Sequence, residues 1–96
     1  MTNENVYKFQ WDKGNTGKNL KHKVKDEEAE QIFFDKNKVI SNDISHSQKE
    51  KRYIVIGKTR KGRLLFTIFT FRGKHIRIIS SRDINKKEVY FYEKTD

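Results

Sequence analysis

Three β-rich runs follow one another between residues 52 and 80, and only short turns separate them. RYIVIGK (52–58), RLLFTIFTF (63–71) and HIRIIS (75–80) are rich in β-branched and aromatic residues, whereas TRKG and RGK are typical turn sequences. Such close spacing favours strands that pair with their neighbours in antiparallel fashion. We therefore expect an antiparallel meander, in which the apolar run 63–71 is a central strand covered on both faces.

Two further strands are expected before the meander. In VYKFQW (6–11) aromatic residues alternate with other side chains, which predicts a short strand with one aromatic face. KVIS (38–41) predicts a weaker strand, and the polar stretch 42–51 is expected to be the loop that joins it to the meander.

Helices are expected on both sides of the strands. Two precede the meander, over residues 16–23 and 26–34, and one follows it over residues 85–94. Asn85 and Glu88 have the spacing of a capping box at the start of the last helix. The order of elements predicts an α+β domain, with two N-terminal helices and a C-terminal helix packed on an antiparallel sheet.

The composition limits what else the chain can be. A length of 96 residues predicts a single domain over residues 1–96 with a modest core. Hydrophobic residues make up only 33% of the chain, but twelve aromatic residues favour a folded protein over a disordered one. The chain has no cysteine, no run suited to a membrane span and no signal-peptide pattern, so a cytoplasmic protein without membrane contact is expected.

Positive charge is concentrated in the second half of the chain. Residues 1–50 carry nine lysines and nine acids, which cancel, so residues 51–96 carry the entire net charge of +9. All six arginines lie between Lys51 and Arg82, in a stretch without any acid. This segregation attracts polyanions, and nucleic acid is the first candidate partner. An acidic protein is the second candidate, and a lysine excess that only keeps the protein dissolved is the third interpretation.

The motifs of common cofactor and metal sites are missing. The sequence contains no dinucleotide-binding fingerprint, no P-loop and no nucleophile elbow. His22, His46 and His75 lie far apart without metal-ligand spacing, and the acids of residues 27–30 fit a solvated helix start. We therefore expect neither a metal nor a cofactor.

Chemistry that needs only arginine, lysine and histidine exists for RNA. The 2′-hydroxyl attacks the adjacent phosphate, so the protein has to position the strand and assist proton transfer. It also has to stabilise charge in the transition state, and the planar fork of arginine suits that task. Arg77 and Arg82, in and just after the last predicted strand, are candidates for this role, and Arg52 is a third.

Each candidate also has an ordinary structural explanation. Arg77 could pair with Glu88, Arg82 could contact the C-terminal helix, and Arg52 could be a solvated strand start. His22 could close a helix C-terminus, where a cation is favoured. Four cations around a hairpin turn are either phosphate contacts or solvated residues: Lys58, Arg60, Lys61 and Arg63. From the residues alone we expect a basic domain that binds nucleic acid, and whether it is an enzyme stays open.

Four segments, taken together, carry a family resemblance over residues 7–93. They are FQWDKGNTGKN, EEAEQIFFD, HSQKEKRYIVIGKTRKGRLLFTIFTFR and IRIISSRDINKKEVYFYE. The most specific pieces are WD after the first strand, E-x-R-Y-I-x-I-G, and the ending IRIIS-x-R…E…Y. In this combination the chain resembles the BrnT family of type II toxins.

The resemblance implies a RelE-like fold and a ribonuclease that arrests growth by cutting RNA. It also implies a cognate BrnA-like antitoxin, which neutralises the toxin and takes the complex to operator DNA through a ribbon-helix-helix part. Residues on matching motif positions are Arg52, Arg77, Arg82, Glu88 and Tyr92, and the pair Lys21 and His22 resembles a Lys-His pair of the family.

We interpret the chain as a metal-independent endoribonuclease toxin. Arg77 and Arg82 are expected to bind the scissile phosphate, Arg52 to position it, and His22 to transfer protons with Lys21 as its substitute. Further contacts to the RNA backbone are expected from Lys58, Arg60, Lys61, Arg63, Arg72 and Lys74. One alternative is a non-catalytic basic module that binds nucleic acid and leaves it intact, and another is a pure interaction protein with an acidic partner.

Arg77 and Arg82 pose a geometric problem. Strict alternation along a strand would place their side chains on opposite faces of the sheet. Both can bind one phosphate only if the strand ends near Ser80, so that SSR turns before the last helix. The predicted strand 75–80 ends at that position.

Overall fold

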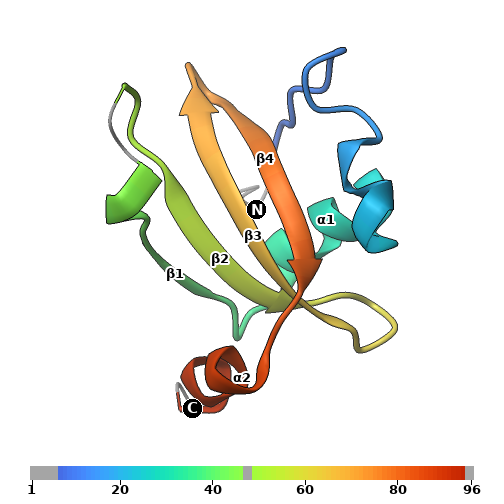
Figure 1. Ribbon diagram of the computed structural model, residues 1–96, viewed down its shortest axis with the longest axis vertical. Coiled ribbons are helices and arrows are strands. Elements are labelled where there is room, and N and C mark those ends of the chain that lie inside the picture. The colour runs from blue at the N-terminus through green and yellow to red at the C-terminus, as the bar shows by residue number, and fades with distance from the viewer. Residues whose placement is uncertain (1–6, 47–48, 95–96) are drawn as a thin grey trace, which may run out of the picture.

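Four strands form one antiparallel sheet in the order β1-β2-β3-β4 (Figure 1). The structure is a computed structural model, and it describes residues 7–46 and 49–94. The strands are β1 (Val39–Asn42), β2 (Tyr53–Lys58), β3 (Leu64–Arg72) and β4 (His75–Asp83). The predicted meander is therefore confirmed, and the weaker strand expected over residues 38–41 joins it at one edge.

Short helices precede and follow the sheet. They are the 3-10 helices η1 (Lys18–His22), η2 (Ile32–Phe34) and η3 (Ile44–His46), and the α-helices α1 (Asp26–Gln31) and α2 (Lys86–Glu93). The capping box of Asn85 and Glu88 is present at the start of α2, as predicted. None of the helices in the described ranges has the length and apolar character that a membrane span requires.

The prediction of an α-helix over residues 16–23 is wrong. Only 3-10 turns form there, from Lys18 to His22. Gly17 before them has a φ of 69° and Lys23 after them a φ of 61°, and both left-handed values are incompatible with an α-helix. The described part of the chain before β1 therefore contains one α-helix, α1, instead of the two expected.

The aromatic segment near the N-terminus lies along the edge of β4 and does not form a full strand. Within the described residues, its contact with the sheet ladder is a single parallel bridge between Phe9 and Ile76. The first position of the predicted strand 6–11 lies outside the described residues. Tyr7, Phe9 and Trp11 pack against the core, so the prediction of one aromatic face is confirmed.

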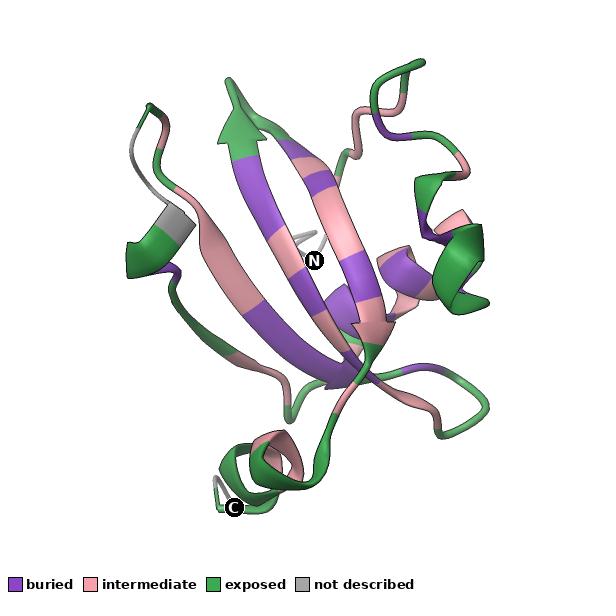
Figure 2. Cartoon of the chain, viewed as in Figure 1, coloured by how far each residue is buried: buried purple, intermediate pink, exposed green. Residues whose placement is uncertain are grey.

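The core lies between one face of the sheet and the α1–η2 segment (Figure 2). Leu65, Thr67 and Phe69 of β3 are buried on this face. Phe33 of η2 is also buried, and its ring meets the ring of Phe69 edge-on with 5.0 Å between the centroids. Because aromatic side chains bury a large area, a core of this kind compensates for the low hydrophobic content of the chain.

The opposite face of the sheet is only partly covered. Phe66 and Ile68 of β3, which alternate with the buried residues, are half-buried. Helix α2 lies at one end of the sheet (Figure 1), and none of its own residues is fully buried. The prediction that the run 63–71 is covered on both faces is therefore wrong. We call this partly covered surface, which also carries Ile54 and Ile56 of β2, the open face.

An extra residue in β4 interrupts its pairing with β3. Ile68 and Phe69 of β3 lie opposite Ser80 and Ile78, so the intervening Ile79 has no partner. Such a β-bulge shifts the alternation of side chains by one residue. As a result, buried side chains on both sides of the bulge face the core.

Gly57 of β2 lies against the backbone of η2. A Cβ atom there would be 2.8 Å from the carbonyl oxygen and 2.9 Å from the Cβ of Ile32. We expect Gly57→Ala to push η2 away from the sheet and to lower the free energy of unfolding by about 1–3 kcal/mol. Urea denaturation followed by circular dichroism measures the change. Ser41→Ala, at an exposed site on β1, should change it by less than about 0.5 kcal/mol, and an unchanged Gly57→Ala protein contradicts this packing.

Candidate functional site

Arg77 and Arg82 project from the same face of β4. Arg77 lies opposite Thr70 of β3. Arg82 lies opposite Phe66, which precedes Thr70 by four residues on β3. Side chains four residues apart on a strand share a face, and directly paired residues do so as well. Both arginines therefore belong to the open face.

The predicted strand end near Ser80 is wrong, because β4 continues to Asp83. The unpaired Ile79, and not a strand end, brings Arg77 and Arg82 to one face. Their backbone positions are separated by about 13 Å, which corresponds to four residues of β3 at about 3.3 Å each. Their guanidinium groups are bound to different carboxylates, those of Asp12 and Glu88, so the expected clamp of both arginines on one phosphate stays a prediction.

Arg52 lies on the same face at the level of Arg77. Arg52 directly precedes β2. The first residue of β2, Tyr53, pairs with Phe69 of β3, so Arg52 lies beside Thr70. Arg52 and Arg77 therefore flank Thr70 across three neighbouring strands. The carboxylate of Glu50 lies 3.7 Å from the Arg52 guanidinium and 3.2 Å from that of Arg72, so Glu50 forms ion pairs with both arginines.

The guanidinium of Arg77 is held by the turn that follows the N-terminal segment. It donates to both carboxylate oxygens of Asp12 at 2.9 and 3.0 Å and to the side chain of Gln10 at 3.0 Å. The hydrogen bond from Arg77 lowers the pKa of the Asp12 carboxyl, and the Gly14 amide lowers it further. A Cβ atom on Gly14 would be 2.6 Å from the guanidinium, so glycine leaves the space that Arg77 occupies.

The guanidinium of Arg82 is held by the first turn of α2. It donates to both carboxylate oxygens of Glu88, at 2.9 and 2.8 Å, and lies 4.2 Å from the centre of the Phe66 ring. The hydrogen bond with Glu88 raises the pKa of Arg82. Burial raises the pKa of Glu88, but the bonds from Arg82 and from the Asn85 amide outweigh it and leave that pKa below its usual value. The expected structural contact of Arg82 with the C-terminal helix is thus present.

Lys21 and His22 lie on η1, which packs beside β4 (Figure 1), and both are exposed. The backbone carbonyl of His22 accepts a hydrogen bond of 3.3 Å from Arg63. In the part of the chain that the structure describes, no hydrogen bond or ion pair joins the His22 imidazole to Arg77 or Arg82. The structure therefore brings the three arginines to one face but does not join the acid–base candidate to them.

The remaining predicted cations occupy opposite ends of the sheet. Those at the β2–β3 turn are Lys58, Arg60, Lys61 and Arg63, and those at the β3–β4 turn are Arg72 and Lys74. Arg63 ties the sheet to the helices, because its guanidinium contacts Asp83 at 2.6 Å and Glu28 at 3.2 Å. Its hydrogen bond lowers the pKa of Asp83, as expected for a stable pair.

A groove of about 460 Å³ lies between the open face and α2. Its walls are mainly apolar and include Ile54, Ile56, Phe66 and Phe91. Arg82 stands at its border, because its guanidinium lies over the Phe66 ring. A groove with apolar walls and a cation at its border can accept a flat, partly apolar group that carries a negative charge.

The sequence did not predict the contacts of several residues of this site. Gln10 and Asp12 meet Arg77 across 67 and 65 positions of the chain. Phe66 belongs to the run 63–71, which was expected to be covered on both faces, and Phe91 was not singled out in the sequence. Among the described residues, no group of three or more His, Cys, Asp or Glu side chains is placed to hold a metal ion.

Fold and site together define a small basic α+β domain in which Arg52, Arg77 and Arg82 share one sheet face beside an apolar groove. Residues 11–88 match the family described as "Ribonuclease toxin, BrnT, of type II toxin-antitoxin system". This match covers more than half of the chain, so the chain belongs to the BrnT family, and the resemblance seen in the sequence is confirmed. Membership makes RNA its substrate class and an antitoxin its partner. No curated protein matches the chain.

Replacing Glu88 by Gln removes the carboxylate that binds Arg82 and caps α2. The pKa of Glu88 lies below 4.5 in the folded protein, so its stabilising effect is present above that value and is lost as the pH falls through the lowered pKa. We expect Glu88→Gln to lower the free energy of unfolding by about 1–2 kcal/mol at neutral pH.

Denaturant unfolding at neutral and at acidic pH measures this difference, which should shrink below pH 4.5. Glu93→Gln, at the end of the same helix, is the matched control and should have little effect. A difference that is equally large at acidic pH contradicts the role of the Glu88 charge.

Proposed function

We propose that this protein is an endoribonuclease toxin that cleaves RNA without a metal ion. The observation that carries the proposal is the β-bulge at Ile79, which places Arg77 and Arg82 on one face of the sheet with Arg52 beside them. Membership of a ribonuclease family supports the substrate class. The cationic face supports a mechanism in which side chains, and not a metal, stabilise the charge on the reacting phosphate.

In this mechanism the RNA supplies its own nucleophile. The 2′-oxygen forms a bond to the adjacent phosphorus while the bond from phosphorus to the 5′-oxygen breaks. The 2′-hydroxyl gives its proton to a base, and the departing 5′-oxygen takes one from an acid. The products are a 2′,3′-cyclic phosphate and a 5′-hydroxyl, so neither water nor an external reactant enters this step.

The arginines are proposed to contact successive parts of the strand. Arg82, at the border of the groove, binds the scissile phosphate and stabilises its added charge. Arg77 and Arg52, about 13 Å further along the sheet, bind a neighbouring phosphate. Glu88 is a positioning residue, because it holds both nitrogens of the Arg82 fork from the end of α2.

The groove beside Arg82 is proposed to receive a base next to the scissile bond. Phe66 and Phe91 offer apolar surfaces, and stacking of a base on an aromatic ring contributes about 1–3 kcal/mol. Lys87 also lines this groove and supplies a further positive charge. A base held here would place its own phosphate near Arg82.

His22 is the proposed acid–base residue, with Lys21 as its substitute. Both are exposed on η1 beside β4, so RNA bound along β4 can reach them. Lys58, Arg60, Lys61 and Arg72 are proposed to hold the RNA backbone. Arg63 is left out of this set because Asp83 and Glu28 hold its guanidinium, and Lys74 is left out because it lines a pocket on the core side.

The remaining family properties belong to the same proposal. We propose a RelE-like fold, a cytoplasmic location and a BrnA-like antitoxin that carries the complex to operator DNA. The antiparallel sheet preceded and followed by helices agrees with such a fold.

Cleavage of RNA by the purified protein in EDTA tests the proposed chemistry. We expect activity to survive EDTA and to fall by about 100-fold or more in Arg82→Ala, because one stabilising donor contributes a factor of that order. Arg77→Lys keeps the charge but loses the fork, so it should also lose activity. Lys94→Ala removes one exposed charge at the end of α2, from a residue that is given no RNA contact, and is the matched control.

Two outcomes would contradict the proposal. RNA that stays intact at high protein concentration, with binding that weakens steeply as salt rises, identifies a non-catalytic binding module. Activity that EDTA abolishes and added magnesium restores identifies a metal-dependent nuclease. Circular dichroism of each variant excludes loss of folding as the cause of inactivity.

A further inference from the structure

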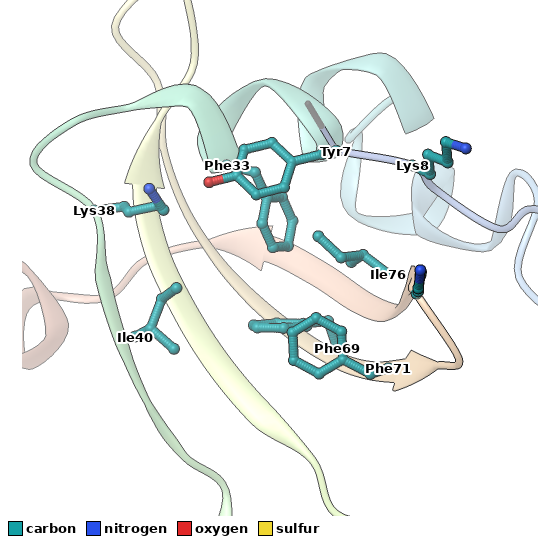
Figure 3. A pocket seen from close by; sticks show the side chains of 9 residues that line it. Tyr7, Lys8, Phe33, Lys38, Ile40, Phe69, Phe71 and Ile76 are labelled. Carbon is teal, nitrogen blue, oxygen red and sulfur yellow. The ribbon is translucent and has the colours of Figure 1, made fainter. Parts of the chain in front are cut away.

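A second pocket lies on the core side of the sheet, near the turn that joins β3 to β4 (Figure 3). Its volume is about 120 Å³, and its apolar lining comes from Tyr7, Phe33, Ile40, Phe69, Phe71 and Ile76. The side chains of Phe71 and Ile40 are 51% and 49% exposed. The pocket therefore opens into an apolar surface that the described helices leave uncovered.

Lysines complete the lining of this pocket. They are Lys8, Lys38 and Lys74, and none of the described residues that line it is acidic. The ammonium group of Lys38 lies 5.9 Å from the centre of the Tyr7 ring. In Figure 3, Lys8 and Lys38 lie at the margins of the apolar floor and come from different segments. An apolar floor with a positive margin fits a ligand that is apolar at one point and acidic around it.

The volume of the pocket matches one apolar side chain. A protein cavity of about 150 Å³ with an apolar lining accepts a benzene molecule, so a pocket of this size takes a group such as the side chain of leucine. Apart from the Tyr7 hydroxyl and the lysines, its lining side chains carry no polar group. The polar edges of a nucleobase would lose their hydrogen bonds on such a floor, which disfavours RNA as the occupant.

We propose that this pocket is a docking site for the antitoxin and that it receives one apolar side chain from an acidic segment of that partner. The proposal rests on the antitoxin partnership of the family, and it is independent of the RNA chemistry proposed for the open face. Charge complementarity comes from the three lysines. No arginine lines the pocket, and arginine is the cation best suited to phosphate, so the lining again favours carboxylates of a protein over RNA.

The docking pocket and the arginines lie on opposite faces of the sheet. Phe71 pairs with Ile76 on the core side, whereas the next residue of β4, Arg77, belongs to the open face. An antitoxin segment in the pocket therefore leaves Arg82 and the groove uncovered. It follows that RNA and such a segment can bind at the same time, and that another part of the antitoxin has to block the open face.

A peptide titration followed by NMR tests the docking site directly. The probe is acetyl-Asp-Glu-Leu-Glu-Asp-amide, added to the ¹⁵N-labelled protein, and the matched control peptide has serine in place of leucine. We expect the leucine peptide to shift the amide signals of Ile40, Phe71 and Ile76, and not that of Arg82. The serine peptide should cause much weaker shifts. An uncleavable 2′-O-methyl RNA, added second, should bind without displacing the leucine peptide.

A variant of two lysines at the margin of the pocket provides the second measurement, which is the affinity for the peptide. Lys8→Glu combined with Lys38→Glu should weaken peptide binding by about tenfold, as expected when two surface ion pairs are reversed, and should leave RNA cleavage unchanged. Equal binding of both peptides, or shifts confined to the open face, would overturn the docking site. Shifts of Phe71 and Ile76 caused by the RNA would assign the pocket to nucleic acid instead. Peptide binding is measured without RNA cleavage, so the docking site can be tested even if the protein has no ribonuclease activity.

Discussion

The unpaired Ile79 in β4 decides which side chains reach each face of the sheet. Without it, strict alternation would send either Arg77 or Arg82 toward the apolar core, where an unpaired charge is costly. The extra residue lets Ile78 and Ser81 both face the core while the two arginines share the open face. The candidate site thus depends on one insertion in a strand pairing, which makes the bulge the central constraint of the structure.

Carboxylates of the chain bind the two arginines that are proposed to contact phosphates. Asp12 and Glu88 each engage one arginine through both oxygens, which is the geometry that arginine also uses for phosphate. Asp12 is 55% exposed and lies in a turn, whereas Glu88 is 13% exposed and caps α2. Arg77 itself is 12% exposed and Arg82 is 39% exposed, so Arg82 is the more accessible of the two arginines, while the less exposed Glu88 holds it in place.

Local patterns in the sequence were sufficient for the strands, the capping box of α2 and the aromatic face of the N-terminal segment. They failed where a long-range contact or a single backbone angle decides the outcome. Gly17 and Lys23 have left-handed backbone angles, so 3-10 turns form where an α-helix was expected. A bulge leaves no mark in the alternation of HIRIIS, because it depends on how β3 packs. Charge segregation pointed to the basic half of the chain that carries the three arginines, but the partner of Arg77 lies 65 positions away and could not be predicted.

The most direct measurement is an NMR titration of the protein with a single-stranded 2′-O-methyl RNA, which lacks the nucleophile and stays intact. The account predicts that guanidinium signals of Arg77 and Arg82 shift together, and that the amides of Thr70 and Phe66 between β2 and β4 respond as well. Simultaneous saturation of both arginines would show that one strand spans the open face. Shifts of only one arginine, or shifts confined to the β2–β3 turn, would contradict the claim that the bulge at Ile79 creates the RNA-binding face.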